Sequence, residues 1–129
     1  MPTIPWKTLA PPSHDRDYVV LLTFLPLRSY LRIPLFFRFT QGIQAQLATT
    51  PGVVGYSLRA QPLSKRFWTL SAWESEAALR AFVAEAPHSS SMRDLAPHMA
   101  PTRFTRWRLR GAELPPRWDD ALRRETTRD

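Results

Sequence analysis

Histidine is the side chain best suited to acid–base chemistry near neutral pH, and one of the three histidines in this chain has apolar neighbours at helical spacing. His88 is followed four and seven residues later by Met92 and Leu95, so all three share one face of an expected helix. A neutral imidazole on such a face could accept a proton or bind haem iron or another metal. The alternative is a histidine that starts a helix and hydrogen-bonds to the backbone.

Large apolar side chains in the same half of the chain could line a cavity for a flat, apolar ligand. The candidates are Trp68, Trp73, Phe82, Met92 and Trp107. The same residues could instead fill the core of a small domain and a subunit interface. The sequence leaves both interpretations open.

Several other kinds of site lack the residues that they need. The chain has no cysteine, which excludes disulfides, thiolate nucleophiles and cysteine-ligated metals. His98 could join His88 at a metal, but Pro97 intervenes and no carboxylate stands at ligand spacing, so we expect no metal site. Serines follow His88 without a Gly-x-Ser-x-Gly elbow, and no glycine-rich phosphate loop is present.

The elements that must position these residues follow from hydrophobic periodicity. Strands are expected at 17–24, 53–60, 66–73 and 102–109, and helices at 31–48 and between Ser75 and Pro87. Pro34 suits the first turn of the first helix, and Ser75 is a candidate N-cap of the second. Pro87 predicts a break and a restart of the second helix over 88–95, and a terminal helix is expected within 115–124.

This order predicts an α+β, ferredoxin-like βαββαβ domain with a four-stranded antiparallel sheet and an extra C-terminal helix. We expect one domain over 18–129, preceded by a proline-rich N-terminal arm over 1–17. Phe104 and Trp107 have opposite parity, which a β-bulge in the last strand would reconcile. With the helices on one face, the bulky residues of the other face need a partner, so a homodimer with its sheets face to face is expected.

The segment from Trp68 to Phe82 resembles the third strand and second helix of the antibiotic-biosynthesis-monooxygenase-like branch of the dimeric α+β barrel proteins. In that family an aromatic-rich strand ends in a turn such as Trp73-Glu74-Ser75, and an apolar helix follows. The similarity covers about 18–109. It implies a dimeric α+β barrel with an apolar pocket. Members of the family include cofactor-free oxygenases of polyketide quinols, haem-degrading enzymes and many domains without a known activity, and this chain most resembles the uncharacterised members.

Haem-degrading members of this family combine an asparagine in the first strand with a tryptophan and a histidine in the second helix. Counted from Trp73, the tryptophan position falls near Phe82 and the histidine position at Met92, and the strand at 17–24 has no asparagine. His88 is the only nearby replacement for the missing ligand. We therefore expect neither haem nor another cofactor.

Charge and hydropathy limit the partners of the chain. Eighteen basic residues against eleven acidic ones give a net charge of +7, but no nucleic-acid-reading motif accompanies them, so nucleic-acid binding is not expected. No apolar run is long enough to span a membrane and no leader peptide is recognisable, so a cytoplasmic location is expected.

Two functional interpretations remain. In the first, the chain binds a small apolar or aromatic compound and is a monooxygenase-like enzyme: His88 removes a proton from an aromatic or polyketide-like substrate that Trp73, Phe82 and Met92 shield from water. In the second, it is a non-catalytic binding or assembly module. Catalysis requires His88 to border a cavity, whereas the module predicts a filled core.

Overall fold

The computed structural model describes residues 3–85 and 88–127, and within them five strands form one antiparallel sheet. The strand order is β1-β3-β4-β2-β5, with every neighbouring pair antiparallel. The strands are β1 (Thr3–Thr8), β2 (Asp17–Pro26), β3 (Val53–Gln61), β4 (Arg66–Trp73) and β5 (Arg103–Arg110).

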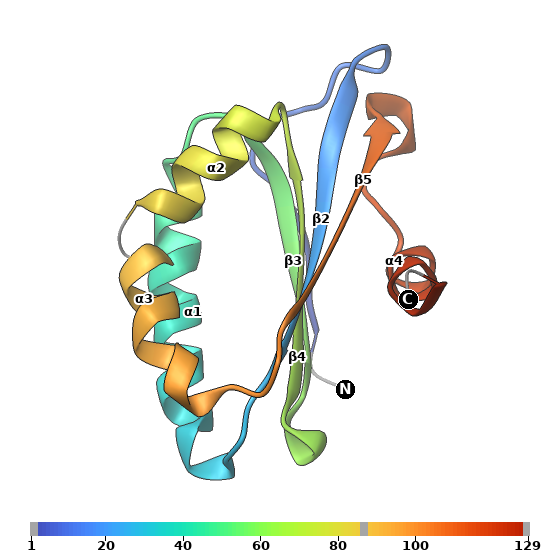
Figure 1. The fold of residues 1–129 in the computed structure, drawn as a ribbon. Helices are drawn as coiled ribbons and strands as arrows, with labels where there is room; N and C mark the ends of the chain where they lie inside the picture. Colours follow the sequence, from blue (N-terminus) through green and yellow to red (C-terminus); the bar gives the residue numbers. More distant parts are fainter. Residues whose placement is uncertain (1–2, 86–87, 128–129) are drawn as a thin grey trace.

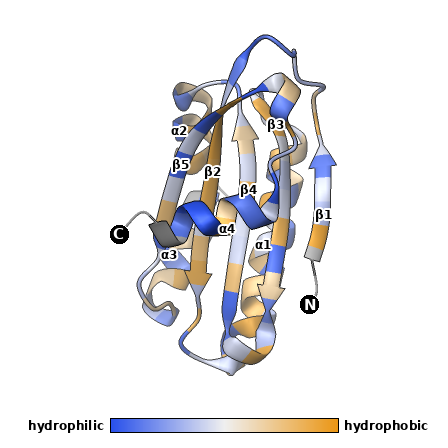
Figure 2. Cartoon of the chain, turned by 90° about the vertical axis from the view of Figure 1, so that its right-hand side faces the viewer, coloured by the Kyte–Doolittle hydropathy of each residue, from blue (hydrophilic) through white to orange (hydrophobic). Residues whose placement is uncertain are grey.

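Helices cover both faces of the sheet. The helices α1 (Ile33–Ala48), α2 (Glu76–Ala84) and α3 (His88–Leu95) lie together on one face of the sheet, which we call the inner face (Figure 1). The helix α4 (Trp118–Thr127) crosses the opposite, outer face (Figure 2). Four single 3-10 turns lie in the connections, at Tyr30–Arg32, Pro62–Ser64, Ala96–His98 and Gly111–Glu113.

The expected helix signals are present where the helices begin and end. Pro34 lies in the first turn of α1, and the Ser75 hydroxyl accepts a hydrogen bond from the Ala78 amide at 3.1 Å, which caps α2. After α1 the chain turns at Gly52, whose φ of 87° favours glycine. The break predicted at Pro87 lies outside the described residues.

The sheet has five strands, so the expectation of four was wrong. The additional strand, β1, pairs antiparallel with β3 and comes from the segment read as a proline-rich arm. Its register shifts between Ile4 and Lys7, the interval that contains Pro5. An edge strand with an irregularity tolerates a proline because the missing amide donor need not reach a neighbour there.

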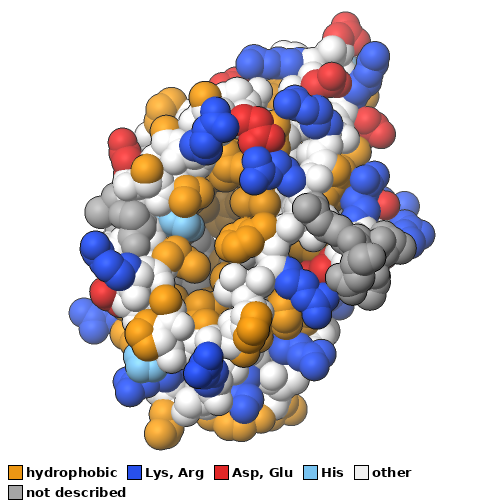
Figure 3. Space-filling view, in the orientation of Figure 1, with side chains coloured by type: hydrophobic (Ala, Val, Ile, Leu, Met, Phe, Trp, Pro, Cys, Tyr) orange, Lys and Arg blue, Asp and Glu red, His pale blue; other side chains and the backbone are white. Residues whose placement is uncertain are grey.

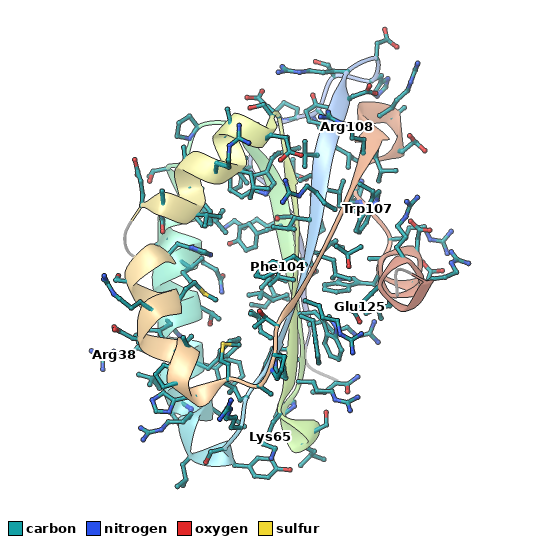
Figure 4. All side chains as sticks on the ribbon, in the orientation of Figure 1. Arg38, Lys65, Phe104, Trp107, Arg108 and Glu125 are labelled. Carbon is teal, nitrogen blue, oxygen red and sulfur yellow. The ribbon has the colours of Figure 1, made fainter. Side chains whose placement is uncertain are left out.

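No bulge interrupts β5, contrary to the sequence analysis. The strand pairs with β2 in continuous register from Arg103 to Arg110. Phe104 faces the helices of the inner face, and Trp107 lies on the opposite side, toward α4 (Figure 4). Phe104 and Trp107 can therefore lie on opposite faces of a regular strand, because apolar side chains cover both faces of the sheet.

The outer face is covered by α4, and this changes the argument for a dimer. Its buried cluster includes Val20, Leu22 and Leu70, and Trp118 and Leu122 of α4 pack against them. The sequence argument for a homodimer started from an uncovered outer face, and that premise is wrong. The homodimer itself stays a prediction.

No helix in the described part of the chain combines the length and the apolar character needed to cross a bilayer.

Candidate functional site

A cavity of about 300 Å³ lies between the sheet and the three inner helices. The inner core is divided into two apolar clusters, one containing Trp73 and Phe82 and the other containing Phe36 and Phe67. Residues of both clusters line the cavity, which is therefore the space that separates them.

The sizes of the inner-facing residues on β2 and β4 explain this space. Along β4 the large Phe67 and Trp73 stand at the two ends, with Thr69 and Ser71 between them. On β2 one inner-facing hydroxyl residue, Thr23, pairs across the sheet with Thr69 and lies between Leu21 and Leu25. Aromatic side chains at both ends hold the helices away from the sheet, and the smaller residues between them cannot fill the gap.

The cavity opens at the edge of the sheet formed by β5. Phe104 lines it and is 54% exposed, which places this ring at the mouth (Figure 4). The space-filling view shows a hollow between apolar side chains on this side of the molecule (Figure 3). Val83 of α2 is also a lining residue and is exposed. Two residues after Phe104, Arg106 forms an ion pair with Glu76 that joins β5 to the first turn of α2.

His88 is fixed in the cavity wall by contacts with two other helices. Its amide donates to the side-chain oxygen of Gln46 on α1 at 2.9 Å, and the Gln46 amide group donates to the Phe82 carbonyl at 3.3 Å. The imidazole also contacts the Phe82 ring, with 4.9 Å between centroids, and Phe82 in turn contacts Trp73 at 5.1 Å. Gln46 therefore ties the end of α2 and the start of α3 to α1.

The surroundings of His88 favour a neutral imidazole. Its Nδ1 lies 3.4 Å from the Val83 carbonyl oxygen, which can only accept a hydrogen bond, so Nδ1 carries the hydrogen and Nε2 keeps its lone pair. Burial lowers the pKa of His88 below 6.5, and the backbone hydrogen bond opposes this only in part. Nε2 can therefore serve as a proton acceptor at neutral pH.

Few polar groups other than His88 line this largely apolar cavity. The Tyr56 hydroxyl donates to the side-chain oxygen of Gln44 at 3.4 Å, and burial raises the pKa of Tyr56, which keeps the phenol protonated. The Trp73 indole donates to the Ser71 hydroxyl at 2.8 Å. A bound compound would meet apolar walls and a small number of hydrogen-bonding groups, as is usual in small-molecule sites.

The structure brings together some of the predicted site residues and separates others. His88, Trp73, Phe82 and Met92 all line the cavity. Trp68 and Trp107 belong to the cluster under α4, so the expectation that they share one cavity with the others was wrong. They point away because positions 68 and 107 face the outer side of the sheet.

Sequence reasoning missed the polar residues of the wall. Gln44 and Tyr56 line the cavity, and Gln46 fixes His88, but none of them was singled out. The alternation along β4 carried a usable signal, because two small hydroxyl residues lie between large aromatic ones on one face of that strand. Gln44 also lies among the apolar residues of α1 that face the sheet.

No group of three or more His, Cys, Asp or Glu side chains is arranged to hold a metal ion within the described residues. His98, the second histidine considered for a metal, lies in the 3-10 turn Ala96–His98 after α3.

Sequence comparison finds no family model that matches the chain and no curated protein that matches it. Structure comparison does find similar proteins. A protein from Lactobacillus acidophilus NCFM, named as a presumed monooxygenase, has a TM-score of 0.66 and 9% identity. The match covers 84% of this chain and 49% of that protein, so the chain spans about half of its length.

Two further structures are informative. SnoaB from Streptomyces nogalater, a cofactor-independent oxygenase, has a TM-score of 0.57 and 15% identity, over 70% of this chain and 90% of that one. A dimeric ferredoxin-like protein of unknown function from Thermobifida fusca has a TM-score of 0.61 and 13% identity, over 75% and 95%. Presumed antibiotic biosynthesis monooxygenases from other bacteria also match. At these identities the likeness concerns the fold, and the chain has the ferredoxin-like α+β fold of the antibiotic-biosynthesis-monooxygenase-like proteins.

Proposed function

We propose that the chain binds a small apolar or aromatic compound in the inner cavity and that His88 acts on it as a proton acceptor. The observation that carries this proposal is the cavity of about 300 Å³ with His88 in its wall. A filled core, which a purely structural module would have, leaves no room for a ligand. The fold shared with a cofactor-independent oxygenase supports the same reading.

The proposed chemistry is oxygenation of an acidic carbon or phenol without a resident cofactor. Nε2 of His88 removes a proton from the substrate, and the apolar wall keeps water away from the resulting carbanion or phenolate. Dioxygen is the co-reactant. For a CH2 group the overall change is replacement of two hydrogens by one oxygen to give C=O, and the second oxygen atom leaves as water.

Anthrone, a tricyclic carbon acid, is a suitable probe. We expect it to bind, as measured by calorimetry, and to be converted to anthraquinone with consumption of dioxygen. General-base catalysis contributes about 100-fold or more, so His88→Gln should reduce turnover by about that factor while the affinity changes by less than about threefold. His98→Gln is the matched control, because His98 is not among the residues of the cavity wall.

The outcomes separate the two candidate functions. Binding without turnover in the unaltered chain would favour a non-catalytic binding module. Turnover that His88→Gln leaves unchanged would remove His88 from the proposed mechanism. Failure of anthrone and of smaller phenols to bind at all would contradict the proposed function.

A further inference from the structure

A second cavity, of about 210 Å³, lies beside the first at the opposite edge of the inner face. It is bordered by Ile4 of β1, Phe37 of α1 and Ala60 of β3, and its lining is mostly apolar. Ile4 and Phe37 are partly exposed, so this cavity reaches the surface near β1, whereas the first opens near β5.

The two cavities share part of their walls. Phe36, Thr40 and Leu58 line both of them, so these three side chains are all that the two linings have in common along their boundary. Phe36 is held by a ring contact with Phe67 at 4.4 Å between centroids. Thr40 belongs to α1 and Leu58 to β3, so the boundary runs from the helix layer to the sheet.

The character of the two cavities differs. His88, Tyr56 and Gln44 line the first, whereas the one charged residue that lines the second is Arg59, whose guanidinium lies over the Trp118 ring on the outer face of the sheet. A compound that used both would therefore place its polar, reactive part in the first cavity. Thr40 and Leu58 border both cavities from opposite layers, so a part of a ligand that extended from the first cavity into the second would lie between them and would have to be narrow and mostly apolar.

We propose that the two cavities together hold one ligand, whose acidic head group lies beside His88 and whose unbranched alkyl or acyl tail passes between Thr40 and Leu58 into the second cavity. This inference rests on the proposed function and specifies its substrate class. A rigid polycyclic compound would occupy the first cavity alone.

A series of 4-alkylphenols from ethyl to decyl tests the proposal by calorimetry on the full chain. Each methylene that leaves water should increase affinity about fourfold, and the increase should continue through the longer tails. The variant Thr40→Leu narrows the space between Thr40 and Leu58, so it should weaken the binding of decylphenol at least about tenfold more than it weakens the binding of ethylphenol.

Gln41→Leu is the matched control, because it introduces the same leucine side chain on the same helix. Gln41 is exposed and lines neither cavity. This variant should leave the affinity for every alkylphenol of the series unchanged. If Thr40→Leu does not fold, Leu58→Ala provides the opposite test: it widens the passage and should preserve or increase the gain from long tails.

The failures of the two proposals are distinguishable. If ethylphenol binds and competes with anthrone, but affinity stops rising at short tails or Thr40→Leu matches Gln41→Leu, the two-cavity ligand is wrong and the proposed function stands. If no phenol in the series binds and anthrone does not either, the proposed function itself fails.

Discussion

Helices cover the apolar side chains on both faces of the sheet, but the packing between helix and sheet differs between the inner and the outer face. Three helices cover the inner face and leave a cavity of about 300 Å³ between two clusters. On the outer face, a single ten-residue helix packs against one continuous cluster. Ala121 of α4 is fully buried there, and its small side chain allows the helix to lie close to the sheet.

The difference arises from where the large side chains stand and not from how many helices are present. On the outer side of β4, Trp68, Leu70 and Ala72 form an uninterrupted apolar row. On the inner side of the same strand the two aromatic residues are separated by Thr69 and Ser71. One strand therefore contributes to a filled core on one side and to the wall of a cavity on the other.

Truncating adjacent residues of β2 gives the largest expected difference between the faces. Leu22 is fully buried in the outer cluster, whereas Leu21 borders the cavity. Leu22→Ala should lower the free energy of unfolding by about 3–4 kcal/mol and Leu21→Ala by about 1–2 kcal/mol, because less new empty space is created beside an existing cavity. Urea unfolding measures both, and equal losses would contradict the contrast.

Loosening α4 should have the next largest effect. Trp118 packs on the outer cluster, and its indole donates to the Ser57 hydroxyl at 3.0 Å. Trp118→Ala should cost about 2–3 kcal/mol, because the side chain is only partly buried. It should also increase self-association, measured by light scattering after size-exclusion chromatography, because apolar sheet surface becomes accessible.

The matched control for α4 is Arg117→Ala, which removes an exposed ion pair with Asp119 just before the helix and should change neither property. If the unaltered chain is a dimer and Trp118→Ala leaves that dimer intact, the dimer contact lies elsewhere than on the outer face.

A substitution that fills the cavity should make the inner face as closely packed as the outer face. Thr69→Leu puts a larger apolar side chain in the middle of the cavity wall and should raise the free energy of unfolding by about 0.5–1 kcal/mol. The same change should weaken anthrone binding at least about tenfold. Thermal unfolding and calorimetry measure the pair of effects, and a gain in stability with unchanged binding would place the ligand outside the cavity.

The two faces should also respond to acid in different pH ranges. Because burial lowers the pKa of His88, the unfolded chain binds more protons there, so this contribution to stability is complete above about pH 6.5 and declines as the pH falls toward the lowered pKa. A hydrogen bond from Arg124 lowers the pKa of Asp120 on α4, so that contribution is complete above 3.8 and is lost only in stronger acid.

The free energy of unfolding, measured with urea between pH 7.5 and 5, should therefore decline as the pH falls. The slope should be smaller than about 1.4 kcal/mol per pH unit, the value for uptake of one full proton. His88→Gln should flatten that decline and Asp120→Asn should not. A profile that His88→Gln leaves unchanged would show that His88 does not cause it.

Much of the fold was predictable from local signals. The strand at 66–73 agrees with β4 at both ends, and the Ser75 cap was identified from its position before an apolar helix. β1 was missed because two early prolines argue against a strand unless it lies at an edge, and the edge is decided by pairing with β3.

The site was predictable only in part. His88, Trp73, Phe82 and Met92 were identified, but Trp68 and Trp107 were placed with them. The alternation of side chains along a strand shows which residues lie on opposite sides of the sheet. When both sides are apolar, it does not show which side borders the cavity. The residues of the wall that come from α1 depend on how far that helix stands from the sheet, which no local pattern specifies.

The order of the strands also decides when in folding the cavity can exist. β2 lies between β4 and β5, and Leu22 pairs with Leu70 on one side and with Thr105, about 80 residues along the chain, on the other. Such distant pairing is slow to establish, and the rim residue Phe104 arrives with it. The complete cavity therefore forms only late in folding, and a compound that binds in it should mainly delay unfolding.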